Sequence, residues 1–412
     1  MIVYSPHASP GQSKGQNTPP APARSLFLSP DFLTLYGATL FAAVALFLST
    51  ILPWHIRALG MSADHIGYIM GAWFAGTLAG MLPASRLIQH FGPRPVVLGG
   101  ALLLASSYAL MPSAESVACF IGLRLVQGLS WSGVLLGTIT FVTLLTPKKT
   151  RTQGLGIHGA IFISSQAIGP WMAEFVVDGY GFTALFFLGV VLAASSSVMA
   201  FFLPAKQPEP HGQSSAAENI VTKCGLLLAV AFAVAVGFGC AMSFLADYVN
   251  RLGLPSVTGF FTGYIVVTLT IRFCFGAALD RIGASRLLLI SSVAQASAFT
   301  VLMLANSSWH LITAGGLFGI AVAIYIPVLQ ALMIDRLSNR AKAITAYNFS
   351  FFMGATLASV FLGQVAERFG YGHVLWIVIG ASWVGFFLLL VDAVLERPGK
   401  APAPAQTPAP SP

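Results

Sequence analysis

The sequence predicts an all-α integral membrane protein built from two similar six-helix bundles. Three observations predict it: a large excess of apolar residues, twelve apolar segments of membrane-spanning length, and a short charged loop present in two copies about 190 residues apart. The two copies read SRLIQHFGPRP (Ser85–Pro95) and GAALDRIGASR (Gly276–Arg286), and each lies between two apolar segments. Internal repeats of this kind are typical of duplicated membrane proteins.

Composition excludes several classes of protein. Of the 412 residues, 56% are hydrophobic and 8% are charged, whereas a soluble domain carries roughly a quarter charged residues. The net charge of +8 does not indicate nucleic acid, because the 21 Lys and Arg residues are scattered between apolar segments. The four cysteines lack metal-ligand spacing, and the motifs of nucleotide-binding, zinc-dependent and serine-hydrolase sites do not occur. We therefore expect no enzyme activity, no cofactor, no metal site and no nucleic-acid partner.

The apolar segments set the domain organisation, since each is close to the roughly 20 residues that cross the hydrocarbon core. We predict a six-helix bundle over 29–203, a polar linker over 204–223 and a second six-helix bundle over 224–393. The tails, 1–28 and 394–412, lack the apolar content to order themselves and are expected to be disordered. The predicted spans are Phe32–Trp54, Ile66–Ile88, Pro95–Met111, Val117–Leu144, Gly154–Val177, Phe182–Leu203, Gly225–Ala246, Val257–Leu279, Leu287–Asn306, Leu311–Ile334, Ala343–Val365 and Val374–Val391.

The distribution of Lys and Arg predicts the orientation. With a cytoplasmic N-terminus, the inner loops hold twelve of these residues and the outer loops hold only Arg57, Arg251 and Arg368. Cytoplasmic loops are enriched in Lys and Arg, so we expect both termini in the cytoplasm. The twelve inner residues are Arg86, Arg94, Lys148, Lys149, Arg151, Lys206, Lys223, Arg281, Arg286, Arg336, Arg340 and Lys342.

The charged loop is more complete in its second copy. That copy carries Gly276, Asp280, Arg281, Gly283 and Arg286. The first copy keeps Gly92 and Arg94, but has Gln89 in place of the acid and His90 in place of the arginine. A carboxylate at a helix end can bond a neighbouring helix N-terminus and pair with arginines. We predict that the two copies form a gate at the cytoplasmic end, with most of its charge in the second copy; an exposed salt bridge, worth about 0–1 kcal/mol, is the alternative.

The fourth span contains LRLVQGLSWSG, with Arg124, Gln127 and Gly128. An arginine in hydrocarbon costs about 3 kcal/mol on insertion scales, so Arg124 should face a polar cavity or a partner. It would poise an acid for proton exchange or attract an anionic substrate; the alternative is a buried arginine that stabilises packing. Arg272 lies one turn before Gly276, so we expect it to reach the membrane surface and join the second loop.

The fifth span contains GIHGAIFISSQAIGP, which ends on Gly169 and Pro170. A proline in a helix removes a backbone hydrogen bond and bends the helix, and a glycine lets a neighbouring helix approach closely. We predict either a hinge between the two halves or simple tight packing at this position. Trp171 and Met172 follow directly.

In this order and placement the motifs resemble those of the major facilitator superfamily, over essentially Phe32–Val391. The loops are similar to the family's motif A, and the fourth-span sequence is similar to its motif B. The fifth-span sequence is similar to motif C, which is associated mainly with the exporter and antiporter branch, although Trp171 and Met172 replace the glycines usual there. The resemblance implies the family's fold of two pseudo-symmetric six-helix bundles and a place in the drug and metabolite proton-antiporter branch.

The resemblance also implies a secondary active transporter that moves a small organic molecule by alternating access, with proton-coupled efflux as the leading mechanism and the proton gradient as its energy source. Two alternatives stay open. One is an importer, symporter or uniporter of a sugar, organic acid or other metabolite; the other is a transport-inactive membrane sensor, which the Gln89 loop makes thinkable. We expect a multi-pass protein of a bacterial inner membrane that works as a monomer among lipids.

Proton coupling needs a titratable group at mid-depth, and the sequence offers few. Glu174 and Asp247 lie near outer ends of spans and His158 near an inner end. Arg124 and Glu174 fall in the same half of the membrane and could pair, while capping or packing roles are the alternatives for Glu174 and His158. The cavity is otherwise expected to be aromatic, hydroxylated and amidic, which suits an amphipathic organic molecule. Its candidate lining residues are Trp73, Trp131, Gln166, Trp171, Tyr325, Gln330, Tyr347 and Asn348.

Overall fold

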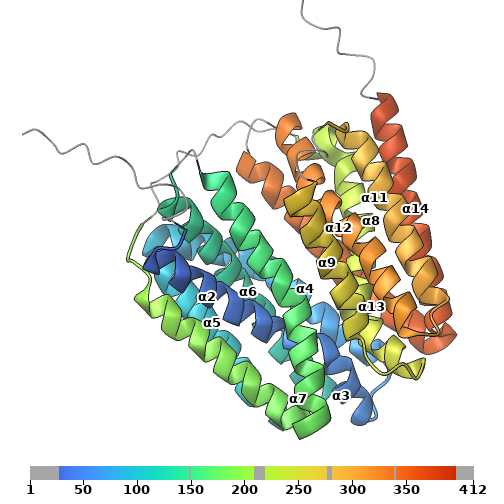
Figure 1. Ribbon diagram of the computed structural model, residues 1–412, viewed down its shortest axis with the longest axis horizontal. Helices are drawn as coiled ribbons and strands as arrows, with labels where there is room; N and C mark the ends of the chain where they lie inside the picture. Colours follow the sequence, from blue (N-terminus) through green and yellow to red (C-terminus); the bar gives the residue numbers. More distant parts are fainter. Residues whose placement is uncertain (1–26, 148–149, 208–218, 276–280, 338–339, 396–412) are drawn as a thin grey trace, which may run out of the picture.

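The computed structural model describes residues 27–147, 150–207, 219–275, 281–337 and 340–395. All regular secondary structure in these ranges is helical. Figure 1 shows the long helices in two groups, an N-terminal half in blue and green and a C-terminal half in yellow and red. The all-α membrane fold predicted from the sequence is confirmed.

The N-terminal half begins with α2 (Pro30–Leu48), which passes through the 3-10 turn η1 (Ser49–Ile51) into α3 (Leu52–Ala58). The element α7 consists of two helices that meet at Gly181, and these correspond to two of the predicted spans. Gly181 turns the chain between them with a φ of 80°, where a glycine is strongly favoured. The remaining elements of this half are α4 (Ala63–Phe91), α5 (Pro93–Leu110), η2 (Met111–Ser113), α6 (Val117–Leu145) and α7 (Arg151–Phe202).

The C-terminal half begins at Ile220, five residues before the apolar run, because Asn219 caps the helix through a 3.3 Å hydrogen bond from the Thr222 amide. Ten helical stretches in the described residues are long and apolar enough to cross a membrane, and α9 is a shorter apolar helix. With α7 divided at Gly181, these make the twelve predicted spans. The elements of this half are α8 (Ile220–Arg251), α9 (Thr258–Cys274), α11 (Ala284–Met303), α12 (Ser308–Arg336), α13 (Arg340–Phe369) and α14 (Tyr371–Leu395).

The helices pack mainly within their own half. In the N-terminal half α7 packs on α2 and α5, and α6 packs on α4 and α5; in the C-terminal half α12 packs on α9 and α11, and α8 packs on α13 and α14. The halves meet along two seams, α4 with α13 and α7 with α9. The first seam is tight because Gly67 and Gly363 face each other: a Cβ on Gly67 would lie 2.4 Å from the Ser359 carbonyl oxygen.

The antiparallel helices define two ends of the molecule. The closed end contains residues 57–65, 174–181, 247–258 and 367–371, and it lies at the bottom of Figure 1, where α3 and α7 approach the C-terminal half. The loop end contains 85–95 and 281–286, the described parts of the two charged loops. Two structural differences from the predicted tails are that Phe27 is buried against Phe32 and that α14 continues to Leu395.

Candidate functional site

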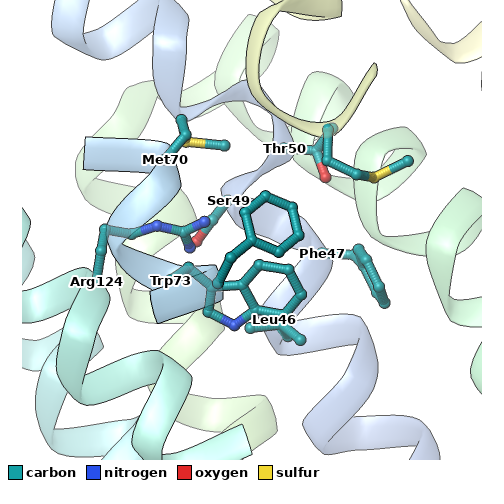
Figure 2. A pocket seen from close by; sticks show the side chains of 9 residues that line it. Leu46, Phe47, Ser49, Thr50, Met70, Trp73 and Arg124 are labelled. Carbon is teal, nitrogen blue, oxygen red and sulfur yellow. The ribbon is translucent and has the colours of Figure 1, made fainter. Parts of the chain in front are cut away.

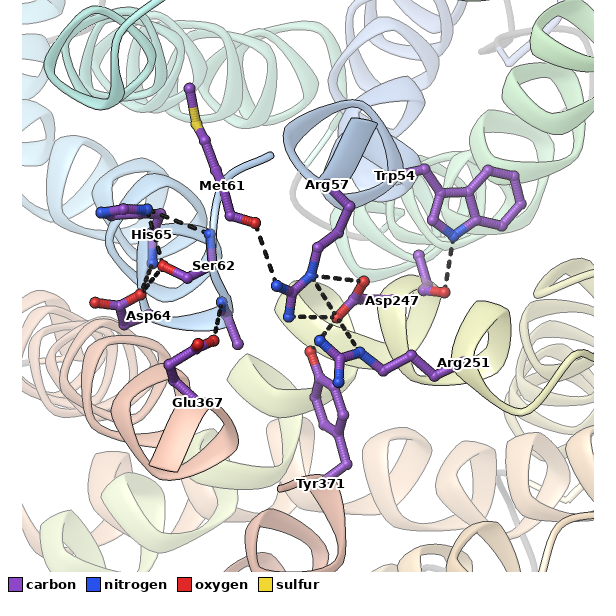
Figure 3. A network of polar contacts seen from close by, with 12 residues as sticks. Trp54, Arg57, Met61, Ser62, Asp64, His65, Asp247, Arg251, Glu367 and Tyr371 are labelled. Atoms are coloured by element: carbon purple, nitrogen blue, oxygen red, sulfur yellow. Dashed lines mark hydrogen bonds and ion pairs between the residues drawn. The ribbon is translucent and has the colours of Figure 1, made fainter. Parts of the chain in front are cut away.

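A buried carboxylate joins the two halves at the closed end. Asp247 of α8 is 1% exposed, and its two oxygens accept 3.1 Å hydrogen bonds from Arg57 of α3. Arg251 pairs with the same carboxylate at 3.3 Å, and the Tyr371 hydroxyl donates to it at 2.5 Å. Figure 3 shows these four side chains converging from three helices. A bidentate arginine–carboxylate pair fixes both distance and orientation, so this cluster holds the halves in one register.

Two further carboxylates bridge the halves by capping helices. Glu174 of α7 accepts hydrogen bonds from the Val257 amide at 2.6 Å and the Ser256 hydroxyl at 2.5 Å, and a third from Thr258, all at the start of α9. Glu367 of α13 accepts from the Ala63 amide, at the start of α4, at 2.8 Å. Helix N-termini present free N–H groups and positive potential, so each carboxylate stabilises a helix of the opposite half.

A hydrogen bond between neutral groups also joins the two halves at the closed end. The Trp54 indole of α3 donates to the Ala246 carbonyl of α8 at 2.8 Å. The closed end therefore combines an ion-pair cluster, two charged caps and this indole bond across the halves.

The motif in α6 places a buried arginine inside the N-terminal half. Gly128 lets α6 approach α4, since a Cβ there would lie 2.3 Å from the Trp73 carbonyl oxygen. This contact sets the Arg124 guanidinium 5.9 Å from the Trp73 ring centre, and its Nη1 donates to Gln127 Oε1 at 2.8 Å. Arg124 is 3% exposed. Its Nε and the Gln127 Nε2 have no hydrogen-bond partner in the part of the chain that the structure describes.

Arg124 lines a small cavity near the middle of the bundle, drawn in Figure 2. The space inside is about 20 Å³, which holds about one water molecule. Only Met242 comes from the C-terminal half, so a movement of that half would enlarge the cavity. The lining residues are Leu46, Phe47, Ser49, Thr50, Met70, Trp73, Phe74, Arg124 and Met242.

The pairing of Arg124 with Glu174 that the sequence left open does not occur, because Glu174 is committed to the start of α9. Among the described residues Arg124 has no carboxylate within ion-pair distance. The nearby hydroxyls are also committed: Ser49 and Tyr108 bond each other at 2.7 Å, and Tyr108 donates to the Ala45 carbonyl. Arg124 therefore brings a buried positive charge to the cavity wall without an acidic partner from these residues.

Two predicted site residues of α7 have polar partners. His158 is buried, and its Nε2 lies 3.0 Å from the Thr138 hydroxyl of α6, a contact within one half. Gln166 accepts from the Tyr264 hydroxyl of α9 at 3.1 Å, so it belongs to the second seam between the halves. In this conformation the contact of His158 is therefore one of packing within the N-terminal half, while Gln166 lies where the halves meet.

The remaining lining candidates are scattered. Trp131 stacks on Phe162 with ring centres 5.3 Å apart, and Tyr325 bonds Ser292 at 2.5 Å inside the C-terminal half. Of the four other candidates, Trp171 is exposed and Gln330 and Asn348 are half-buried, while Tyr347 is buried and stacks on Phe351. Of the predicted lining residues, Trp73 alone lines the Arg124 cavity.

The motif in α7 acts through close packing. A Cβ on Gly169 would lie 2.5 Å from the Cβ of Phe47, so this glycine lets α7 approach α2 of the same half. The helix runs through Pro170, and its non-helical residue is Gly181. Tight packing, the second of the two predicted roles, is what this conformation displays.

At the loop end the described arginines of the second charged loop are exposed. Gly276 and Asp280 lie outside the described residues. Arg281 and Arg286 have exposed side chains without an ion pair to any described residue, and Gly283 is the N-cap residue that precedes α11. In the first copy Gly92 has a φ of 83°, and Arg94 donates to the Phe201 carbonyl of its own half. Arg272 is half-buried, with Nη1 3.6 Å from the Cβ position of Gly159.

A groove lies near the loop end between α8 and α13. Its volume is about 650 Å³, and its wall is mainly apolar. The lining residues are Ile220, Leu228, Phe232, Lys342, Thr345, Ala346, Phe349, Ser350 and Met353.

Sequence reasoning missed Arg57, Glu367 and Tyr371. A signal for Arg57 was available: the loops that the sequence predicts to lie outside carry only three arginines, and two of them, Arg57 and Arg251, meet on Asp247. An arginine on the side of the membrane that disfavours basic residues needs a local partner.

Comparison with known proteins places the chain among transporters. It is 25% identical over 362 residues to the chloramphenicol resistance protein of Pseudomonas aeruginosa, covering 83% of this chain and 82% of that protein. It is 24% identical over 318 residues to the multidrug resistance protein MdtG of Dickeya zeae (strain Ech586), covering 73% and 78%. It is 20% identical over 345 residues to the multi-drug resistance efflux pump PmrA of Streptococcus pneumoniae, covering 79% and 86%.

Solved structures share the fold. A crystal structure of a mutant of the nucleoside transporter NupG matches with a TM-score of 0.68 at 16% identity, covering 87% of this chain and 98% of that chain. The human organic anion transporter MFSD10 matches with a TM-score of 0.62 at 18% identity, covering 89% and 100%. The model of the Major Facilitator Superfamily matches residues 33–271 and 227–412. The chain belongs to the Major Facilitator Superfamily, as a multi-pass secondary transporter of a small molecule and not an enzyme.

Proposed function

We propose that this transporter exports a small organic molecule in exchange for protons across a bacterial inner membrane, as a monomer. The loop end faces the cytoplasm in this proposal, as the distribution of Lys and Arg favours. The resistance and efflux names of the relatives support export. The observation that carries the proton coupling is the pair of buried carboxylates, Asp247 and Glu174, that join the halves at the closed end.

The proposed mechanism depends on the ion pairs and hydrogen bonds that these two carboxylates form across the halves. Protonating Asp247 would remove the charge that Arg57 and Arg251 share, and protonating Glu174 would weaken its bonds to α9. Either event lowers the stability of the closed end and lets the halves rock about the α4–α13 and α7–α9 seams. Exchange of protons for substrate follows if the substrate leaves through that end while it is open and the protons are then released to the cytoplasm when the loop end opens.

The test is transport by the purified full-length protein in lipid vesicles, with chloramphenicol and fluorescent dyes as probes. An imposed proton gradient should drive accumulation against the probe gradient, and collapsing the proton gradient with an ionophore should stop it. The variant Asp247→Asn should bind probe and lose the gradient-driven component. Flux that is equal with and without a proton gradient would instead identify a uniporter, and absence of flux for every probe would identify a sensor.

A further inference from the structure

The wall of the Arg124 cavity contains more hydrogen-bond donors than the described residues satisfy. Two lining residues, Arg124 and Trp73, each have a buried donor without a partner among the described residues, the Nε and the indole Nε1. Gln127, which is not a lining residue but accepts a hydrogen bond from Arg124, has a third such donor in its Nε2. A guanidinium carries five N–H donors and no acceptor, so it needs acceptors from elsewhere. Buried donors without acceptors cost free energy, and a ligand that supplies an acceptor recovers it.

The positive charge of Arg124 also favours a ligand that supplies acceptors. The two buried carboxylates of the closed end, Asp247 and Glu174, are committed to Arg57 with Arg251 and to the start of α9 respectively. Neither forms an ion pair with Arg124 in the part of the chain that the structure describes. Figure 2 shows the guanidinium extending beside Ser49 and Trp73. Met242 of the opposite half lines the same cavity.

The rest of the wall is apolar and aromatic. Leu46, Phe47, Met70 and Phe74 surround the cavity. Such a lining accepts a hydrocarbon or aromatic body and disfavours a small, strongly hydrated inorganic ion. Because the space is about 20 Å³ with Met242 in place, an organic ligand enters when the halves separate there.

We propose that this cavity binds an amphipathic organic monoanion, with the carboxylate or a similar acidic group on Arg124 and the apolar body against Phe47, Phe74 and Trp73. Arginine matches a carboxylate through two parallel N–H···O bonds, which a neutral analogue cannot reproduce. The inference rests on the proposed transport function only in taking this cavity as part of the substrate pathway, and it names the class of substrate.

The test compares three probes that share one ring system: 2-naphthoate, 2-naphthamide and 2-naphthylmethylammonium. Binding to the full-length protein is measured by calorimetry in nanodiscs of phosphatidylcholine, so that no anionic lipid headgroup competes. We expect 2-naphthoate to bind at least tenfold more tightly than the amide and the cation. Arg124→Gln should remove this preference and leave the affinity for the amide within twofold.

Two further variants keep the result interpretable. Arg124→Lys keeps the charge without the two-pronged geometry, so it should retain part of the preference even if Arg124→Gln fails to fold. Arg272→Gln changes another arginine whose Nε has no partner in the described residues, outside the cavity wall, and it should leave the preference intact. Monodisperse elution and thermal melting check the fold of each variant.

Three results would overturn the proposal: equal binding of the amide or the cation, a preference for naphthoate that survives in Arg124→Gln, or no binding by any of the three probes. The measurement uses no ion gradient. If proton-coupled export fails, the proposal that the cavity binds a monoanion still stands. If the binding experiment fails, the result of the coupling experiment is unaffected.

Discussion

The two ends of the molecule differ in how they use charge. At the closed end Asp247 is buried and shared by Arg57 and Arg251, and Glu174 and Glu367 cap helices of the opposite half. At the loop end Arg281 and Arg286 are exposed. Among the described residues, the charged contacts that bridge the two halves lie at the closed end, while Arg281 and Arg286 of the second charged loop form no ion pair. A transporter that alternates between states closes one end at a time, which fits this contrast.

Burial of charge at the closed end and its exposure at the loop end predict different energetic costs for substitutions at the two ends. An exposed pair contributes about 0–1 kcal/mol. Truncating one partner of a buried, hydrogen-bonded charge pair costs about 2–5 kcal/mol, because the remaining charge is left unpaired. Substitutions at the closed end should therefore move the conformational equilibrium much more than substitutions at the loop end.

The largest effect should come from Asp247→Ala. Its removal leaves Arg57 and Arg251 without their shared acceptor, and we expect the closed state to lose about 2–5 kcal/mol relative to the open state. Spin labels at Glu115 and Asn306, exposed on opposite halves, should report a longer distance by pulsed electron resonance.

The matched control is Asp392→Ala. Asp392 pairs with Arg336 at 2.6 Å, but both lie in the C-terminal half. This variant should lower the melting temperature and leave the label distance unchanged. Equal opening by both variants would show that general destabilisation, not the bridge between halves, moves the labels.

The next effect should come from Gly67→Leu, which forces a side chain against the Ser359 carbonyl oxygen, 2.4 Å from the Cβ position. Overpacking costs about 1–3 kcal/mol, so the α4–α13 seam should open. A cysteine introduced at Met242 in a background without native cysteines should then react faster with a water-soluble maleimide. Gly99→Leu is the control, because its Cβ would meet nothing within 4 Å; equal reaction rates in the two variants would refute a closed seam.

A smaller effect is expected for Glu174→Gln. The amide keeps one acceptor oxygen but loses the charge, so the cap on α9 should weaken by about 1 kcal/mol. Hydrogen exchange at the Val257 amide, which bonds Glu174 at 2.6 Å, should accelerate roughly fivefold. Glu115→Gln, on an exposed residue, should not change it. Unchanged exchange in Glu174→Gln would mean that its charge does not stabilise the seam.

The smallest effect should come from Arg286→Gln at the loop end. Its side chain is exposed, so the distance between labels at Glu115 and Asn306 should stay the same. A large change in this label distance would show that the charged loop already controls the conformation described here. It would contradict the difference between the two ends.

Much of the fold could be predicted from the sequence, because span length and apolar composition are properties of single segments. The turn at Gly181 falls at the junction of two predicted spans, Gly154–Val177 and Phe182–Leu203. The start of α8 at Ile220 was not predicted, because it depends on the cap at Asn219 and not on the apolar pattern.

The site was predicted less well. The depth of Arg124 in its span indicated a cavity residue, and the capping alternative for Glu174 is the one this conformation displays. The bond between Arg57 and Asp247 spans 190 residues of sequence. A single sequence carries no direct trace of such a contact, because it depends on how two halves are placed in space.

The most direct test of the account follows both ends in one protein. One label pair, Glu115 with Asn306, reports the closed end, and another, Lys206 with Arg286, reports the loop end; all four are exposed. The distances should change in opposite directions between the unsubstituted protein and Asp247→Ala, the first lengthening while the second shortens. If both lengthen together, or if the first lengthens alone, the halves do not rock about a common site and the account is wrong.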